Sequence, residues 1–325
     1  MSFTRRLFAG IAVTAAAAIG LGVSDLAAED EFPNKQINVI THAGPGGGTD
    51  ITTRMMMLRA RRELGQDMVV VNKRGGSGAA SLAYMADQDP DGHVIMTITQ
   101  SHIFNILQGK SPLGIDDIAG LARATLDPQI VVVNADSPLQ SLDDLIAASN
   151  AADGGLKWGT TFAGGADHVA IHNFAKAAQE IPYTIVPFEG GGAIVTNLVG
   201  GNVDAALLNY AEGEAQFEAG QLRALAVLAD DRIESLADTP TAIEAGVDNT
   251  AATIRGFVTL SAVPEDRRAI LSEKLVSAMN HGVYQGYLAT GGMAGSSVVG
   301  ADEWTAHIKK IHDDSRTALE ELGML

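Results

Sequence analysis

Cysteine is absent from the 325 residues of this chain. Its absence excludes disulfide bonds, thiolate zinc sites, iron–sulfur clusters and cysteine nucleophiles. Aromatic residues make up only 5%, and basic residues are few, since 22 Lys and Arg stand against 39 Asp and Glu for a net charge of −17. Because no stretch carries the run of Lys and Arg that a phosphate backbone requires, we expect no nucleic-acid partner.

The composition is otherwise that of a globular protein able to bury large cores. Hydrophobic residues make up 46% of the chain and charged residues 19%. The length corresponds to two domains of ~150 residues each. The 36 glycines indicate many tight turns and glycine-rich loops.

The first 28 residues have the pattern of a secretory signal peptide. Arg5 and Arg6 precede an uncharged, alanine-rich stretch over 7–23, and small residues end at Ala28 before an acidic segment. This order predicts export to the periplasm and cleavage after Ala28. The alternative is a membrane anchor, but the stretch is short for a bilayer span and is diluted by glycine and alanine. The paired arginines also resemble the twin-arginine pattern, so both that route and the ordinary secretory route stay open.

Beyond residue 36, short β-branched runs alternate with helical segments. The expected strands are 37–41, 68–72, 94–99, 130–134, 157–160, 184–188, 205–208, 222–228 and 256–262. The expected helices are 50–64, 79–86, 167–179, 193–199, 211–219, 264–281 and 301–322, with a further helix starting at Ser141. This β-α-β order predicts a doubly wound α/β fold. Such sheets bind ligands at the carboxyl ends of their strands, so the loops there are the candidate site.

The strongest local signal is the segment 42–50, HAGPGGGTD, between an expected strand and helix. Glycine lets backbone N–H groups approach a ligand closely, and a helix N-terminus adds free donors that favour an anion. The segment lacks the lysine of a Walker P-loop, and Thr49 stands where a dinucleotide fingerprint needs its third glycine. The alternative is a tight turn with Thr49 or Asp50 as the helix cap.

Two further glycine-rich loops, 160–168 and 187–192, also join an expected strand to a helix. In two facing sheets, three such loops would converge at one rim. That arrangement suits a small anionic molecule held between two lobes.

Signals for metal or covalent chemistry are weaker. His168 and His172 share a helix face as half of a zinc site would, but Val169 stands where the zinc-protease motif needs glutamate. The segment 75–79 approaches a nucleophile elbow but ends in alanine after too long a turn. No carboxylate pair stands out as acid and base. We therefore expect no metal, no cofactor and no catalytic residue, with an exported hydrolase as an alternative.

Taken together, these segments resemble the substrate-binding proteins of tripartite tricarboxylate transporters, also called the Bug family. The resemblance covers nearly all of 32–325 and rests on FPNKQI at 32–37, GPGGGTD at 44–50, VNKRGGSG at 71–78, DPDGH at 89–93, WGT to His over 158–168, LVGGNVD at 198–204 and GQLRALAV at 220–227. It implies a two-lobed periplasmic binding protein of type II whose lobes are joined by two crossover strands. By analogy, lobe one comprises 29–130 plus 256–325, and lobe two comprises 131–255.

The resemblance also implies a function. Members grip a carboxylate between the first and second loops, largely through backbone amides and ordered waters, and deliver it to integral-membrane permease subunits. This implies a monomer that binds a small carboxylate, such as a di- or tricarboxylate or a related organic acid. A ligand-sensing subunit of a membrane regulator is the alternative. The implied ligand-binding residues are Gly46, Gly47, Gly48, Thr49 and Asp50 in the first loop, and Phe162, Ala163, Gly164 and His168 in the second.

Three further candidate ligand-binding residues lie where this chain departs from the family pattern. Glu189 stands where the family usually has lysine, Asn209 occupies a segment that carries ligand-selecting side chains, and Ser101 lies in an atypical segment. An acid at Glu189 selects a ligand with an amine or hydroxyl at its far end, or it points to solvent. These departures leave open which carboxylate is bound.

Overall fold

The computed structural model describes residues 32–161, 163–188 and 190–325. The expected signal peptide (1–28) and two candidate binding residues, Phe162 and Glu189, therefore lie outside the described residues. Within the described ranges, no helix is long and apolar enough to cross a bilayer. The fold given below is that of 33–325, which form one unit.

Five strands form the first half of the β-structure, here called sheet A. Their order is β2-β1-β3-β9-β4, with β1 parallel to both β2 and β3, and β9 antiparallel to β3 and β4. The bounds are β1 (Ile37–Thr41), β2 (Met68–Asn72), β3 (Val94–Ile98), β4 (Ile118–Asn134) and β9 (Ala252–Leu260). The expected strands 37–41 and 68–72 have these same bounds.

The second half, sheet B, contains the end of β4 and four further strands. Both β7 and β8 are antiparallel to β4, and β5 lies parallel between β7 and β6. The bounds are β5 (Leu156–Thr160), β6 (Tyr183–Pro187), β7 (Ala205–Asn209) and β8 (Leu222–Val227). Each sheet carries one lobe of the fold.

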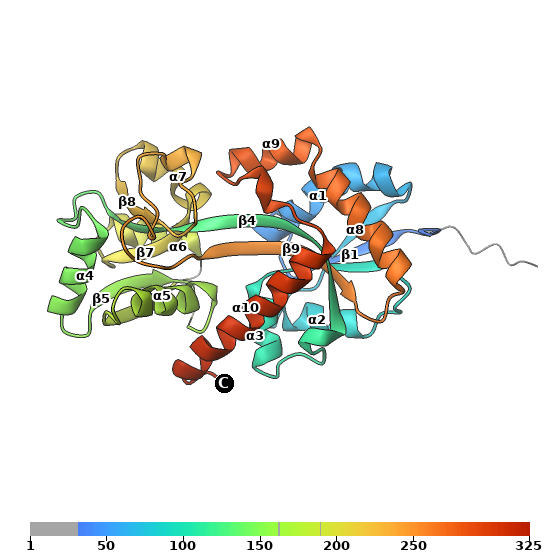
Figure 1. The fold of residues 1–325 in the computed structure, drawn as a ribbon, viewed down its shortest axis with the longest axis horizontal. Coiled ribbons are helices and arrows are strands. Elements are labelled where there is room, and N and C mark those ends of the chain that lie inside the picture. Colours follow the sequence, from blue (N-terminus) through green and yellow to red (C-terminus); the bar gives the residue numbers. More distant parts are fainter. Residues whose placement is uncertain (1–31, 162, 189) are drawn as a thin grey trace, which may run out of the picture. The chain divides into compact units, whose positions relative to one another are not determined.

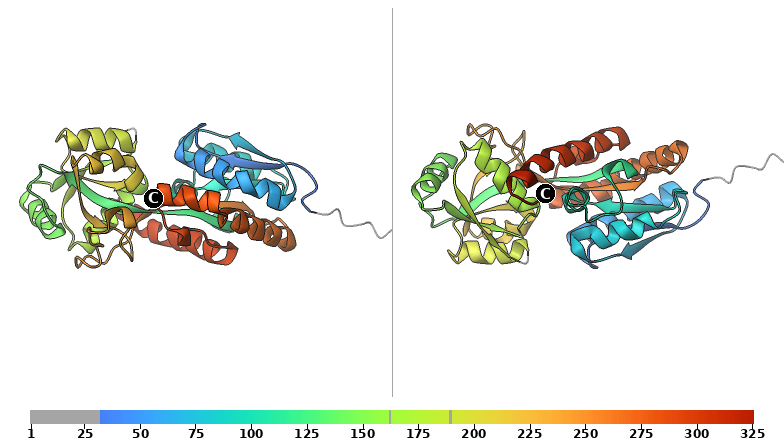
Figure 2. Two further views of the ribbon diagram at one scale, coloured as in Figure 1. Left: turned by 90° about the horizontal axis from the view of Figure 1, so that it is seen from above. Right: turned by 90° about the horizontal axis from the view of Figure 1, so that it is seen from below.

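Strand β4 runs through both sheets, and β9 lies beside it (Figures 1 and 2). Its residues pair with β9 as far as Pro128 and with β7 from Gln129 onward. The sequence predicted only 130–134 as a strand, because Gly120, Arg123 and Asp127 interrupt the apolar pattern before that point. The expected lobe boundaries, 130/131 and 255/256, fall inside these two strands.

Helices cover both sheets. Those that follow or pack on sheet A are α1 (Gly48–Leu64), α2 (Ala79–Ala86), α3 (Gln100–Leu107), α8 (Glu265–Met279), α9 (Gly282–Thr290) and α10 (Ala301–Glu321). Those of sheet B are α4 (Leu142–Ala151), α5 (Ala166–Ala177), α6 (Gly191–Val199) and α7 (Tyr210–Glu218). The sequence analysis missed α3 and α9. Helix α3 starts with the box Thr99–His102, in which histidine takes the place that glutamate or glutamine usually holds.

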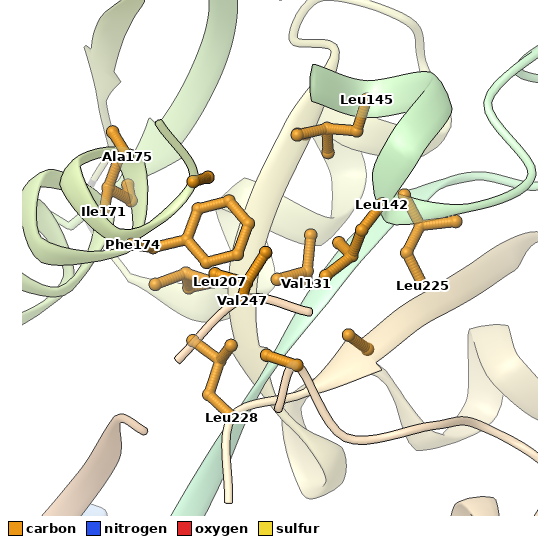
Figure 3. Close-up of a cluster of buried hydrophobic side chains, with 14 of the residues drawn as sticks. Val131, Leu142, Leu145, Ile171, Phe174, Ala175, Leu207, Leu225, Leu228 and Val247 are labelled. Carbon is orange, nitrogen blue, oxygen red and sulfur yellow. The ribbon is translucent and has the colours of Figure 1, made fainter. Parts of the chain in front are cut away.

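Each sheet has a hydrophobic core of its own. In sheet B, Val131 packs with residues of α4 and α5 such as Leu145 and Phe174 (Figure 3). Its neighbour Val132 faces the opposite side, where it packs with Ile194 of α6. Burial on both faces explains the uninterrupted apolar run at the end of β4. A third apolar cluster, which includes Ile98, Phe104 and Trp304, lies on sheet A, so each lobe is a stable support for the loops at the ends of its strands.

Candidate functional site

The first loop is built around the carboxylate of Asp50, which is buried. Its Oδ2 accepts bonds from Gly46 N (2.9 Å) and Arg54 Nε (2.8 Å), and its Oδ1 accepts bonds from Arg54 Nη2 (3.1 Å) and Asn72 Nδ2 (3.0 Å). Burial opposes ionisation, but the bonds from Arg54, Gly46 and Asn72 outweigh it and lower the pKa of Asp50 to about 2. Asp50 therefore shapes the loop, and both of its oxygens already accept hydrogen bonds from the protein.

The backbone donors of this loop fall into two groups. Gly46 donates to Asp50, and Gly47 donates to the carbonyl of Gly44 at 3.0 Å. The N–H groups of Gly48, Thr49 and Asp50 open the 17-residue helix α1, and they meet no acceptor in the described part of the chain. The donors open to a ligand are thus those of the first helical turn, where the helix dipole favours an anion.

The second loop repeats this arrangement. Gly164, with φ +76°, donates to His168 Nδ1 at 2.9 Å, just as Gly46, with φ +81°, donates to Asp50 four residues later. Glycine suits both positions because other residues rarely adopt such φ values. Burial and then His172 lower the pKa of His168, so its ring is a neutral acceptor near pH 7. His168 thus holds the loop in shape, and Ala163 and Gly164 lie at its tip.

Asp167 also serves the second loop. Its Oδ2 accepts bonds from Thr161 N (3.2 Å) and Thr161 Oγ1 (2.8 Å), and its Oδ1 accepts a bond from Gln129 Nε2 (3.0 Å). Burial raises the pKa of Asp167 despite these bonds. Because Gln129 lies on β4, this contact fastens the loop to a crossover strand.

The two histidines of α5 have separate surroundings. His172 Nε2 lies 2.8 Å from Glu321 Oε2, and its Nδ1 lies 3.0 Å from the hydroxyl of Tyr183. Its neighbour His168 instead faces the loop. Among the described residues, no group of three or more His, Asp or Glu side chains is placed to hold a metal ion.

A cavity of about 350 Å³ brings three of the candidate residues together. Ser101, Ala163 and Gly164 line it with residues of the turn before α2 and with Lys110. In that turn Ser77 has φ +51°, and Asn105 of α3 donates to its carbonyl. Helix α3, which the sequence analysis missed, therefore forms part of the wall of this cavity.

Asn209 lies where the two sheets meet, and its side chain is fully used. Its Nδ2 donates to the carbonyls of Asp127 (2.8 Å) and Pro128 (3.2 Å), and its Oδ1 accepts from Thr253 Oγ1 (2.8 Å). Asn209 thereby ties the end of β7 to both crossover strands. In this arrangement Asn209 holds β7, β4 and β9 in place relative to one another.

Arg255 of β9 is a charged residue that the sequence analysis missed. It is partly buried, its Nε is buried without an acceptor, and its side chain forms no hydrogen bond or ion pair with any described residue. Its guanidinium lies at the start of α1, since a Cβ on Gly48 would come within 3.2 Å of Arg255 Nη2. A lone arginine in the otherwise uncharged segment 252–262 was the available signal. Buried donors without partners are rare in folded proteins, so Arg255 indicates a place for an anion.

Two acids, Asp127 of β4 and Glu212 of α7, lie close enough to Arg255 for its charge to act on them. Asp127 of β4 is buried, and burial raises its pKa to about 7, with Arg255 opposing the rise and Glu212 adding to it. Glu212 of α7 is open to solvent, yet surrounding protein raises its pKa. Its Oε2 accepts a bond from Asn209 N at 3.0 Å, and its Oε1 would lie 2.3 Å from a Cβ on Gly191. The glycine at the start of α6 therefore makes room for this carboxylate.

Comparison with known sequences identifies similar proteins. A family model described as "Tripartite tricarboxylate transporter family receptor" matches residues 52–318. Protein BugT of Bordetella pertussis is 29% identical over 245 residues, which cover 74% of this chain and 74% of BugT.

Solved structures show the same fold. A TctC solute binding protein from Polaromonas, without ligand, has a TM-score of 0.80 and 24% identity, with 89% of this chain and 99% of that chain covered. A Rhodopseudomonas palustris protein with adipate has a TM-score of 0.74 and 21% identity, with coverages of 90% and 99%. The two-lobed α/β fold expected from the sequence is confirmed.

Proposed function

Because the chain belongs to the tripartite tricarboxylate transporter receptor family, we propose that it is a periplasmic solute-binding protein that captures a small organic carboxylate between its lobes. In this proposal it hands the carboxylate to the integral-membrane permease of a tripartite transporter and acts as a monomer. The resemblance described from the sequence motifs is thereby confirmed at the level of the family.

One observation carries the carboxylate assignment. Three open N–H groups at the start of α1 and the unpartnered guanidinium of Arg255 occupy the same place. In the absence of an anion the positive end of the helix and the guanidinium repel each other, and an anion between them turns both into attractive partners. The adipate complex of the R. palustris protein supports a carboxylate as that anion.

The proposed binding residues follow from this placement. Gly48, Thr49 and Asp50 offer backbone donors, Gly46 and Gly47 shape the first loop, and Ala163, Gly164 and Ser101 line the cavity described above. Phe162 and Glu189 stay proposals from the family resemblance. His168 and Asn209 hold the loop and the strands in place.

Thermal-shift and calorimetric titration with a panel of carboxylates test the proposal. A ligand at 100 times its Kd adds about 2.7 kcal/mol to stability, so binding should raise the melting temperature clearly. Diamides of the same chain length serve as controls, because they keep the size and lose the charge. A protein that responds to the diamides as well as to the acids would contradict the carboxylate assignment.

The periplasmic location is tested separately on the protein from its native host. We expect the mature chain to begin at Glu29 after removal of 1–28. Mass spectrometry of periplasmic fractions measures this directly. An intact chain that starts at Met1 would rule out the cleaved signal peptide.

A further inference from the structure

We propose that the ligand is a monocarboxylate whose far end donates hydrogen bonds, as an ammonium or hydroxyl group does, and that Arg255 and the start of α1 hold its carboxylate. This inference rests on the proposed function and narrows its substrate class. It predicts discrimination against dicarboxylates, including the adipate found in the R. palustris protein.

The sheet A side of the site provides one place for a negative charge. Asp50, the only acid in the first turn of α1, forms an ion pair with Arg54 and accepts a hydrogen bond from Asn72. The open donors of that turn and the guanidinium of Arg255 therefore keep their positive potential. A carboxylate accepts hydrogen bonds from both a guanidinium and backbone N–H groups, and such charge-assisted bonds are strong.

The sheet B side already contains the protein's own carboxylates. Glu212 lies against Gly191 at the start of α6, and Asp167 occupies the first turn of α5. Each of the two helix N-termini that could attract a second anion thus has an acid beside it. Asp127 lies close enough to Glu212 and Arg255 for their charges to affect its pKa. A second carboxylate on the ligand would face this group of acids and be repelled.

The same acids suit a group that donates hydrogen bonds. The carboxylate of Glu212 is open to solvent and can accept from an ammonium or hydroxyl group while its Oε2 receives the bond from Asn209 N. An ammonium group also gains from opposite charge at this end. The site is therefore positive at the α1 end and negative at the α6 end.

A series of acids of equal length tests this polarity. At each length from four to eight carbons, the ligands are the unsubstituted acid, the terminal hydroxy acid, the terminal amino acid and the dicarboxylate. At six carbons these are hexanoate, 6-hydroxyhexanoate, 6-aminohexanoate and adipate. We expect that at the best length the amino or hydroxy acid binds at least tenfold tighter than the dicarboxylate in calorimetric titration at pH 7.

Variants at the two ends of the site test which residues cause the selectivity. Arg255→Gln should weaken binding of every acid at least tenfold, whereas Arg62→Gln, an exposed change on α1, should not. Glu212→Gln keeps an acceptor for Asn209 N. It should reduce the affinity ratio of the amino or hydroxy acid to the dicarboxylate at least fivefold. Glu214→Gln, a neighbour on α7, is the matched control. Circular dichroism melting checks that each variant is folded.

The outcomes separate the two proposals. A dicarboxylate that binds the wild-type protein as tightly as its amino and hydroxy counterparts overturns the inference and leaves carboxylate capture intact. Unchanged binding in folded Arg255→Gln also overturns it. If no acid of any length binds, the proposed function itself fails.

Discussion

Gly48 is the residue at which the open backbone donors and the guanidinium of Arg255 meet, so a side chain there should disrupt both. In Gly48→Val, the side chain blocks access to the open N–H groups and displaces Arg255. Each hydrogen bond to a charged group contributes roughly 1.5–3 kcal/mol, so losing two should weaken the binding of a carboxylate by about 10² to 10⁴-fold. Calorimetric titration with the best ligand of the acid series measures this loss.

Arg54→Ala is the comparison for Gly48→Val. Arg54 is half exposed and bonded to Asp50, which keeps its bonds from Gly46 and Asn72 in the variant. We expect a loss below about tenfold, because Arg54 supports the loop and does not face the ligand. If Gly48→Val binds normally and Arg54→Ala does not bind, an ion pair with Arg54 holds the carboxylate.

Asp127 makes stability depend on pH. Its pKa is raised from 3.8 to about 7, mainly by burial. Between pH 4 and 7 the folded protein therefore holds a proton that the unfolded chain has lost, so this residue lowers stability as pH rises through that window. Above pH 7 its ionised form costs on the order of a few kcal/mol. Asp127→Asn should be more stable than the wild type at pH 8, with the difference vanishing near pH 4.

Urea unfolding at pH 4, 6 and 8 measures the effect of Asp127→Asn. The opposing charge of Arg255 and the like charge of Glu212 both act on this carboxyl, so Glu212→Gln provides a second comparison. Glu212→Gln should lower the pKa of Asp127, so the stability loss should be smaller and should end at a lower pH. An equal change in stability at all three pH values would show that Asp127 does not titrate in this window.

At the level of elements, local sequence patterns predicted the loops and most strands. They failed where a residue's position or burial depends on contacts with segments distant in the sequence. The glycine segment 42–50 is visible because strand, loop and helix follow one another. Arg255 reaches Gly48 only because β9 pairs with β4 and β3 in the folded sheet. The first part of β4 is buried by helices distant in sequence, so polar residues such as Arg123 hid it from a search for apolar alternation.

Helix α3 is fastened to a crossover strand by one side chain. Gln100 donates to the carbonyl of Ala252 and accepts from Ile254 N at 3.1 Å. Gln100→Ala leaves these two backbone groups of β9 without partners, which should cost about 1–3 kcal/mol of unfolding free energy. Gln108→Ala, at the other end of α3, removes only a contact with Lys110 and should cost much less. Urea unfolding of both variants at pH 7 tests the difference, and equal losses would contradict a role for Gln100 in fastening β9.

At the scale of the whole molecule, the two sheets are joined by β4 and β9, and each sheet has its own core. A rotation about these two strands leaves most of each core intact, but it must shift Val169 of α5, which is buried in the apolar cluster of sheet A. Polar contacts also link α10 to α5: Glu321 at the end of α10 pairs with His172 and Lys176. Partly exposed ion pairs of this kind contribute little stability, so they can break as the lobes move.

We therefore expect the lobes to close on the ligand by hinge rotation at β4 and β9. Groups on opposite sides, Arg255 with the start of α1 and Glu212 with the start of α6, must approach the same small molecule, and closure supplies that approach. Small-angle scattering should show a smaller radius of gyration with the best ligand of the acid series at saturation, and Gly48→Val under the same conditions should show no change. Scattering curves that are identical with and without a ligand shown to bind by calorimetry would mean that capture occurs without closure, and that the lobes are already placed for binding.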